Sequence, residues 1–540
     1  MTDFSAYDTT YLWIVIVAFV VAFVLAIGLG ANDCANSFGT AVGSKVFTIF
    51  QACLLAAIFE TLGAILLGSR VSDTIRKGLF DPLIYTGYEQ VLMIGNLCAL
   101  VSAALWLLVA TVGKIPVSAS HSIVGATLGF HLVIFGGEGI DWAVVLKIVI
   151  SWFISPVLSG IISCIIFGII KYTLLETKQQ LKWGLISLPF WYFIIIFINF
   201  FAVFLGSDRV INVGIWLVPV IAGGAAIFVA IAVYLFLVPY TQSRAVANLK
   251  LEKVKEAEEA TCKETNVDAA VDGRDGANGV DTGSSNPAYE HESIPVPNGN
   301  INNNNNTAVV SKGQEVDEVK IEVKDEGDFL DRPKRERIGK ESAKWLVAKD
   351  SVVVTVICGP LQGLSACFAA FTHGGNDVSN AIGPLVSLYL VYIQGEISSE
   401  ASTPIWILLY GGAGISAGLF LLGRRVIETV GSDLTPMTPS TGLAINIGAA
   451  ITVLIASNLG IPISTTHCLV GSVCAVGFVR SRQAVDWRLF SGIFSAWIFT
   501  VPITVLLSAA LMGLLQHTIP GTCTLVPLNR TADVTSSMQW

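Results

Sequence analysis

Apolar residues recur in long blocks along this chain, and short polar boxes interrupt or border them. Ten blocks approach or exceed the roughly 20 residues that a helix needs to cross a bilayer. They cover residues 11–30, 49–68, 91–113, 143–170, 187–206, 213–239, 351–371, 405–423, 441–459 and 489–515. Two shorter blocks, 122–135 and 468–479, are expected to be re-entrant hairpins or half-spans. The pattern predicts an all-α polytopic membrane protein with about 10–12 membrane helices.

The polar boxes occur twice. Three pairs of segments match: GANDCANSFG at 30–39 with GGNDVSNAIG at 374–383, PVSASH at 116–121 with PISTTH at 462–467, and Asp141-Trp142 with Asp486-Trp487. Their spacings of 344, 346 and 345 residues indicate a duplicated unit. Two inverted repeats with broken or re-entrant helices, each carrying polar residues inside apolar segments, are typical of a transporter with its site between the repeats.

Composition agrees with a membrane protein. The chain is 53% hydrophobic and 13% charged, with a mean hydropathy of +0.68, whereas a soluble domain carries about 25% charged residues. Zinc-protease and P-loop motifs are absent from the sequence, so we expect neither an enzyme nor a bound cofactor. We divide the chain into a first repeat half at 1–240, a linker at 241–345, a second half at 346–520 and a tail at 521–540.

Charge is concentrated in the middle of the chain. Residues 241–350 hold 16 of the 32 Lys and Arg and 22 of the 40 Asp and Glu. Such a segment buries too little apolar surface to offset its ordering entropy, and we predict a disordered linker. Both linker ends are basic, which places the linker in the cytoplasm and the termini outside. Arg70, Arg76 and Lys77 run against this rule, because the same topology puts them outside.

The N-D boxes place Asp33 and Asp377 inside apolar segments, where an ionised carboxylate costs about 2.5–3.5 kcal/mol. Asparagines flank both acids at the same offsets: Asn32, Asn36, Asn376 and Asn380. Glycines beside them are expected to let the backbone leave the helix and turn its carbonyls inward. Carboxylate, amide and carbonyl oxygens suit a hard cation, Na⁺ or H⁺. The alternative is that these small and polar residues only pack helices.

The P-x-S boxes place hydroxyls where a helix can begin. They contain Ser118, Ser120, Ser464, Thr465 and Thr466. Hydroxyls beside the free N–H groups of a helix N-terminus form an anion site, although the same groups can simply cap the helix. Basic residues are scarce in the predicted membrane core, so co-bound cations and helix dipoles must neutralise the anion. His121 and His467 end the boxes and are candidates for substrate contact or proton handling; an ordinary hydrogen bond to a neighbouring helix is the alternative.

These motifs closely resemble those of the PiT family of inorganic phosphate transporters, whose animal members are sodium–phosphate symporters. The resemblance covers about 10–240 and 345–515 and includes SDTIRKG at 72–78. It implies a sodium-coupled phosphate symporter of the plasma membrane that moves its substrate by an elevator-like displacement. It also implies that Asp33 and Asp377 are essential acids, and that the box hydroxyls and neighbouring asparagines bind phosphate.

One position departs from the family pattern. Family members carry an intramembrane Glu where this chain has Asn446, and the resemblance makes Glu60 its counterpart acid. Asn446 keeps an oxygen ligand and loses the charge. We therefore expect Glu60 and Asn446 to join the two aspartates as sodium ligands. Glu60 also lies alone in an apolar run, where a purely structural role is the alternative.

Other functions stay open from the sequence. A channel needs a continuous pore lined by charged rings, whereas the polar residues here lie at predicted helix breaks in a twofold repeat. A non-transporting phosphate sensor and a proton-coupled transporter are the remaining alternatives. The expected partners are phosphate, sodium ions and the lipid bilayer, without nucleic acid, and a homodimer is left open.

Two glycosylation sequons test the orientation. Asn529 begins one just beyond the last span, and Asn305 begins another inside the linker. With the linker in the cytoplasm, Asn529 becomes glycosylated, provided that it lies far enough from the bilayer, and Asn305 does not. Endoglycosidase treatment of the wild type, Asn529→Gln and Asn305→Gln measures this as a shift in gel mobility. A shift that disappears only in Asn305→Gln reverses the orientation.

Overall fold

The computed structural model describes residues 4–33, 35–206, 214–272, 349–398, 401–423, 434–482 and 485–516. The chain divides into two compact units, Met1–Lys253 with Ser342–Trp540, and Val254–Glu341. The described part of the second unit is the end of one helix. Both predicted repeat halves therefore belong to the first unit.

Described residues form helices and short turns, with only an isolated bridge between Phe80 and Ile140. The first half contains η1 (Thr9–Tyr11), α1 (Leu12–Asp33), α2 (Ala35–Gly43), α3 (Ile49–Lys77), η2 (Pro82–Tyr85), α4 (Glu89–Val112), α5 (Ala119–Phe135), α6 (Trp142–Ile170), η3 (Lys171–Leu175), α7 (Gln180–Gly206), α8 (Leu217–Ala232), η4 (Val233–Leu237) and α9 (Val238–Asp272). The second contains α11 (Val352–Gln394), α12 (Ile405–Gly418), η5 (Leu419–Gly423), α14 (Pro439–Asn458), α15 (Thr465–Arg480) and α16 (Trp487–Leu515). Within the described residues, 10 helices are long and apolar enough to cross a membrane, which confirms the predicted class.

The P-x-S boxes separate a long helix from a short one in each half. Helices α5 and α15 have 17 and 16 residues, about 25 Å of rise, which is less than the roughly 30 Å hydrocarbon core. Each begins after an N-cap serine: Ser118 accepts from the His121 N–H at 3.3 Å, and Ser464 from the His467 N–H at 3.2 Å. The two short blocks are thus single helices shorter than a full span, and we refer to α5 and α15 as the half-length helices.

Helix α11 shows that the two hairpins enter from opposite ends. Near the start of α4, Asn96 donates to Ser387 in the last turns of α11 at 3.2 Å. At the base of the α14–α15 hairpin, the Ser440 N–H donates to Asp350, just before α11, at 2.9 Å. Since α11 has 43 residues, about 64 Å of helix, the hairpin bases lie far apart while their tips meet. This is the arrangement expected of inverted repeats.

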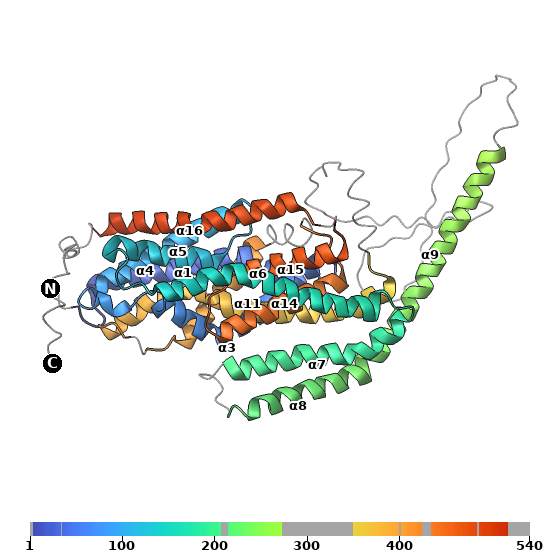
Figure 1. Cartoon of the computed structure of the whole chain (residues 1–540), viewed down its shortest axis with the longest axis horizontal. Helices are drawn as coiled ribbons and strands as arrows, with labels where there is room; N and C mark the ends of the chain where they lie inside the picture. The colour runs from blue at the N-terminus through green and yellow to red at the C-terminus, as the bar shows by residue number, and fades with distance from the viewer. Residues whose placement is uncertain are drawn as a thin grey trace, which may run out of the picture. The chain divides into compact units, whose positions relative to one another are not determined.

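Each half-length helix packs on the helix that follows its equivalent in the other half: α5 on α16, and α15 on α6. Gly125 and Gly471 occupy equivalent positions in these contacts. A Cβ on Gly125 would lie 3.0 Å from the Val501 carbonyl oxygen, and one on Gly471 would overlap the Pro156 carbonyl. Figure 1 shows α16 beside α5 and α15 beside α6. The halves are therefore interlocked rather than merely adjacent.

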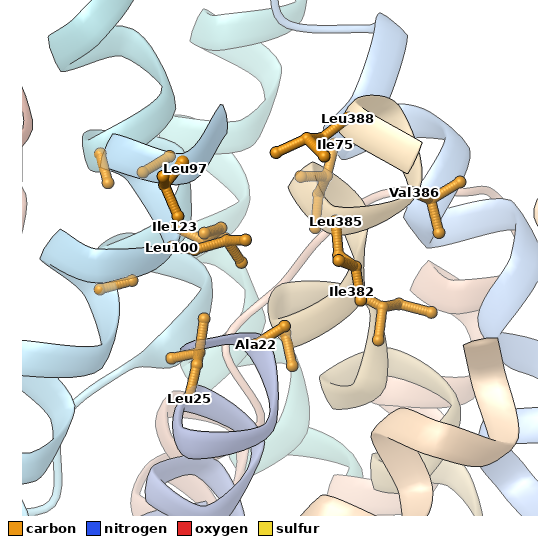
Figure 2. Packing of buried hydrophobic residues seen from close by; sticks show 14 of the residues in the cluster. Ala22, Leu25, Ile75, Leu97, Leu100, Ile123, Ile382, Leu385, Val386 and Leu388 are labelled. Atoms are coloured by element: carbon orange, nitrogen blue, oxygen red, sulfur yellow. The ribbon is translucent and has the colours of Figure 1, made fainter. Parts of the chain in front are cut away.

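Helix α11 also connects two apolar clusters. One cluster contains its residues 378–392 together with parts of α1, α4 and α5, and Figure 2 shows Leu25, Leu100, Ile123 and Leu385 converging there. The other contains residues 353–371 with parts of α2, α7 and α14. The polar box at 374–383 spans the boundary, so the second N-D box lies between two packed apolar regions.

The expectation that glycines break the helix at the N-D boxes is wrong for the second box, because α11 is continuous through it. The glycines instead allow helices to touch. A Cβ on Gly374 would overlap the Glu60 backbone, and one on Gly30 would overlap the Ile415 carbonyl. Small residues permit such close backbone approach between membrane helices.

The beginning of the predicted disordered linker is also different. Residues 241–272 lie in α9 and are helical. The first part of this segment is rich in Ala, Leu, Glu and Lys, which are strong helix formers, and their propensity outweighs the low hydrophobicity. The rest of the linker with Asn305, and the tail with Asn529, lie outside the described residues.

The contact between α1 and α12 is a test of this packing. A Cβ on Gly418 would overlap the Ile27 carbonyl oxygen, and backbone cannot move aside as a side chain does. We expect Gly418→Ala to destabilise the folded protein by about 1–3 kcal/mol through overpacking. Thermal unfolding in detergent measures the loss. Gly223→Ala in α8, where nothing lies within 4 Å, is the matched control and should unfold at or above the wild-type temperature. Equal unfolding temperatures for all three proteins would contradict the close contact.

Candidate functional site

Asp33 and Asp377 lie at the centre of one hydrogen-bonded cluster and are only 5% and 6% exposed. The Asn36 amide contacts Asp33 Oδ1 at 3.3 Å and Thr465 Oγ1 at 3.5 Å. Thr465 Oγ1 in turn donates to Asp377 Oδ2 at 3.1 Å. Two acids that are 344 residues apart in the sequence are therefore connected through one amide and one hydroxyl.

The hydrogen bonds of the cluster cross between the repeats in matching pairs. Asn36 donates to Thr466 Oγ1 at 2.9 Å, and its equivalent Asn380 donates to Ser120 Oγ at 3.2 Å. Thr466 and Ser120 are themselves equivalent. Thr466 donates to the Val117 carbonyl at 3.3 Å, and Ser120 to the Ile463 carbonyl at 2.7 Å. The tips of the two hairpins therefore contact each other, and each holds the N-D box of the opposite repeat.

The symmetry fails at one position. Thr465 donates to both carboxylate oxygens of Asp377, at 3.2 and 3.1 Å. Its equivalent in the first repeat is Ala119, which has no hydroxyl. Asp33 instead accepts from Thr466 of the opposite repeat at 2.9 Å. The second repeat thus supplies hydroxyls to both acids.

Among the described residues, three amide oxygens of the boxes are buried without a hydrogen-bond donor. They belong to Asn36, Asn376 and Asn380. A buried polar atom without a partner is costly and calls for an explanation. Together with the two carboxylates they form a set of hard oxygen atoms in one buried cluster, which suits an alkali cation better than a soft metal. Among the described residues, no group of three or more His, Cys, Asp or Glu could hold a metal ion.

Not every predicted site residue contributes in the same way. Asn32 accepts from the Val117 N–H at 3.0 Å and donates to Thr111 and the Ile115 carbonyl, at 3.2 and 3.0 Å. These bonds hold the turn before α5. Ser118 and Ser464 cap their helices. The structure therefore gives Asn32, Ser118 and Ser464 positioning contacts, whereas Asn36, Ser120, Asn376, Asn380, Thr465 and Thr466 belong to the two-aspartate cluster.

Glu60 and Asn446 lie next to the cluster. Ser37 donates to Glu60 at 3.3 Å, one turn along α2 from Asp33. Thr40 donates to Asn446 at 2.7 Å, a further turn along. In the order of helices α3 matches α12, and α14 matches α4, so Glu60 and Asn446 are not repeat equivalents. Glu60 is on α3 and Asn446 is on α14, and both contact the same face of α2.

His121 and His467 lie behind the hairpin tips, with their ring centroids 4.5 Å apart. His467 Nδ1 is 3.0 Å from the Trp152 carbonyl, and the His121 ring lies against Trp152 with centroids 3.8 Å apart. Both rings line a mainly apolar cavity of about 1100 Å³ between α6, α15 and α16. The alternative of a hydrogen bond to a neighbouring helix therefore describes His467, whereas His121 packs its ring against Trp152 and its Nδ1 has no hydrogen-bond partner among the described residues.

Sequence reasoning left out Ser37 and His373. Ser37 Oγ is 3.1 Å from His373 Nδ1 and also contacts Glu60. Ser37 follows Asp33 by four residues, which places it on the same helical face. That spacing is the signal in the sequence that points to Ser37.

Family comparison agrees with this architecture. Residues 29–508 match the model of the Phosphate transporter family. The human sodium-dependent phosphate transporter 2 is 38% identical, over 94% of this chain and 98% of the relative. The mouse sodium-dependent phosphate transporter 1 is also 38% identical, over 94% and 96%.

A solved structure described as the sodium-dependent phosphate transporter has the same fold. It is 30% identical, superposes with a TM-score of 0.70, and covers 94% of this chain and 100% of its own. The duplicated N-D boxes and the paired hairpins fall within the matched region. This chain therefore belongs to the phosphate transporter family.

Proposed function

We propose that this protein is a sodium-coupled symporter of inorganic phosphate, a multi-pass protein of the plasma membrane. The observation that carries the proposal is the two-aspartate cluster, in which two buried carboxylates and three amide oxygens without donors lie at the meeting point of two half-length helices. The family and the names of the relatives support sodium and phosphate as the transported ions.

The sodium ligands in this proposal are Asp33 and Asp377, completed by the amide oxygens of Asn36, Asn376 and Asn380. The carboxylates supply negative charge where water is excluded, and a cation bound there lowers the cost of their burial. Glu60 of α3 and Asn446 of α14 contact α2 one and two turns beyond Asp33 and extend the oxygen surface away from the pair. We assign them to the cation's route rather than to the central set.

Phosphate in this proposal binds at the N-termini of α5 and α15. The first N–H groups of a helix have no partner within the helix, and the helix dipole favours an anion there. Ser120, Thr465 and Thr466 add hydroxyls at these positions. Their O–H groups donate to carbonyls and carboxylates in this structure. When phosphate binds, these hydroxyls must therefore leave their present acceptors and donate to phosphate instead.

Coupling then follows from electrostatics. Two carboxylates beside the anion site repel phosphate, and the repulsion is strong in a medium of low dielectric constant. Bound sodium ions neutralise the carboxylates and leave the helix N-termini free to attract the anion. Phosphate in turn stabilises the bound cations. Each ion therefore raises the affinity for the other, as symport requires.

Two other functions remain to be separated by experiment. Proton coupling uses the same carboxylates, and a phosphate sensor uses the same site without flux. Uptake of radiolabelled phosphate into proteoliposomes, under a Na⁺, Li⁺ or pH gradient in turn, distinguishes all three. Uptake driven only by Na⁺ supports the proposal, uptake driven by the pH gradient favours proton coupling, and phosphate binding without uptake favours the sensor.

The orientation is part of the proposal: linker in the cytoplasm, termini outside. The Tyr7 N–H donates to the Tyr392 carbonyl at the end of α11, whereas Gln242 and Leu249 of α9 line a hollow with Val353 at its start. The chain therefore begins and enters the linker at opposite ends of α11. Arg76 pairs with Asp73 at 3.3 Å and Arg70 donates to two carbonyls at 3.0 Å, which explains why these charges do not follow the loop rule. The homodimer stays a prediction.

Neutralising either aspartate tests the cation site. We expect Asp33→Asn and Asp377→Asn each to abolish sodium-driven phosphate uptake while leaving membrane insertion intact, because each change removes a charge and keeps the size of the side chain. The matched control is Asp141→Asn, which alters the N-cap of α6 and should transport normally, since asparagine also caps helices. Near-normal uptake with intact sodium dependence in either mutant would refute the assignment.

The asymmetry between Thr465 and Ala119 gives a second test. Thr465→Ala removes the donor to both oxygens of Asp377 and makes the position identical to its repeat equivalent. A hydrogen bond to a charged group contributes about 1.5–3 kcal/mol, so the sodium concentration for half-maximal uptake should rise about tenfold or more. Ser122→Ala, which removes a hydroxyl bonded to its own helix, is the control. If both mutants keep the wild-type sodium dependence, Thr465 does not organise the cation site.

A further inference from the structure

A line of polar side chains leaves the two-aspartate cluster along α2 and runs toward the beginning of α11. It consists of Ser37 and Thr40 on α2 and of Ser44 in the turn just after α2. These three residues follow Asp33 at a spacing that keeps side chains on one helical face. Each contacts a polar residue of another helix: Ser37 contacts Glu60 and His373, Thr40 contacts Asn446, and Ser44 contacts Gln362. We call this set the polar column.

The polar column crosses the apolar cluster around the first half of α11. Residues 362 to 377 account for about 22 Å of this helix. Thr40, Ser365, Gln362 and Asn446 are all fully buried. Polar side chains are costly within a membrane protein and tend to mark ion pathways there. A continuous series from the carboxylates toward one surface therefore has the composition of a route for a hydrated ion.

Gln362 closes the column at its outer layer. Its Oε1 accepts from Ser44 Oγ at 2.7 Å, and Ser44 is half-buried next to the exposed Lys45. The Gln362 Nε2 is buried and has no hydrogen-bond partner among the residues that the structure describes. It lies directly over Gly442 of α14, where a Cβ would overlap it. The amide thus fills the last buried layer between the column and the surface, and it is held by a single side-chain hydrogen bond.

We propose that Gln362 is the gate at the α11-start end of the ion pathway. When Gln362 leaves Ser44, the column opens between Ser44 and Asn446, and the transported ions exchange between the two-aspartate cluster and that side of the membrane. Gln362 is suited to this role because its side chain is flexible and uncharged, and because its amide group can contact the ion as it passes. The proposal rests on the proposed transport function, and it concerns one route into the same site.

Accessibility of a cysteine within the column tests the gate. Ser365 lies between Asn446 and Gln362, accepts from Asn446 at 3.4 Å and is nearly isosteric with cysteine. In sealed vesicles, Ser365→Cys is exposed to a small membrane-impermeant thiol reagent from either side, and its modification is followed by mass spectrometry. A cysteine at the exposed Lys349 reports in the same way which side holds the start of α11.

We expect slow modification of Ser365→Cys alone, and at least about tenfold faster modification from the Lys349 side when Gln362→Ala is added. Gly442→Ala should have the same effect without altering Gln362 itself, because the new methyl group displaces the flexible end of its side chain. The control is Thr452→Ala on α14, whose hydroxyl donates to its own helix outside the column. It should leave the rate unchanged.

The result can be separated from the transport proposal, because the labelling requires neither sodium nor phosphate. Unchanged rates in both Gln362→Ala and Gly442→Ala would overturn the gate, as would acceleration only from the side opposite Lys349 or an equal acceleration in Thr452→Ala. Failure of sodium-driven uptake in the otherwise wild-type protein would refute the symporter and leave the accessibility result standing.

Discussion

The structure depends on holding two carboxylates close together away from water. Asp33 and Asp377 come from opposite repeats, and like charges repel strongly where the dielectric constant is low. Their donors must therefore be rigid and must arrive from several directions. The hairpin tips satisfy both conditions, because Thr465 and Thr466 begin a helix whose position is fixed by α6 and α14. Inverted insertion of the two hairpins is the geometry that brings both tips to the same point.

Much of the fold could be predicted because membrane helices are long and nearly uniformly apolar. The lengths of the spans, the duplication and the half-length helices α5 and α15 all follow from hydrophobicity and repeated proline boxes. The expected helix break at the glycines of the second N-D box is wrong because glycine occurs both at backbone breaks and at close contacts between helices. Which of the two occurs depends on the segment that packs against the glycine. For Gly374 the partner is the Glu60 backbone, which no local pattern reveals.

The residues of the site could be predicted from the sequence, but which of them contact the aspartates and which only position the hairpins could not. Asn32 and Asn36 are identical in type and belong to the same box, yet one holds a turn and the other contacts both the acid and the opposite repeat. The difference arises from the direction of each side chain on α1 and α2. Likewise, Ser464 and Thr465 are neighbours, but only the second reaches Asp377. Repetition in the sequence identifies positions under the same constraint, whereas three-dimensional contacts separate their tasks.

The exchange of half-length helices between the repeats has a consequence for how the protein is made. Helix α5 enters the membrane early in synthesis, but its packing partner α16 is the last described helix to be made. Until α11 and the second hairpin have been made, the hairpin tip with Ser120 also lacks its contacts to Asn380 and Ile463. The polar groups of the first half therefore stay without their hydrogen-bond partners in the bilayer until the second half of the same polypeptide has been made and inserted. Truncated chains of this kind are natural substrates for membrane quality control, since exposed polar groups mark an unfinished fold.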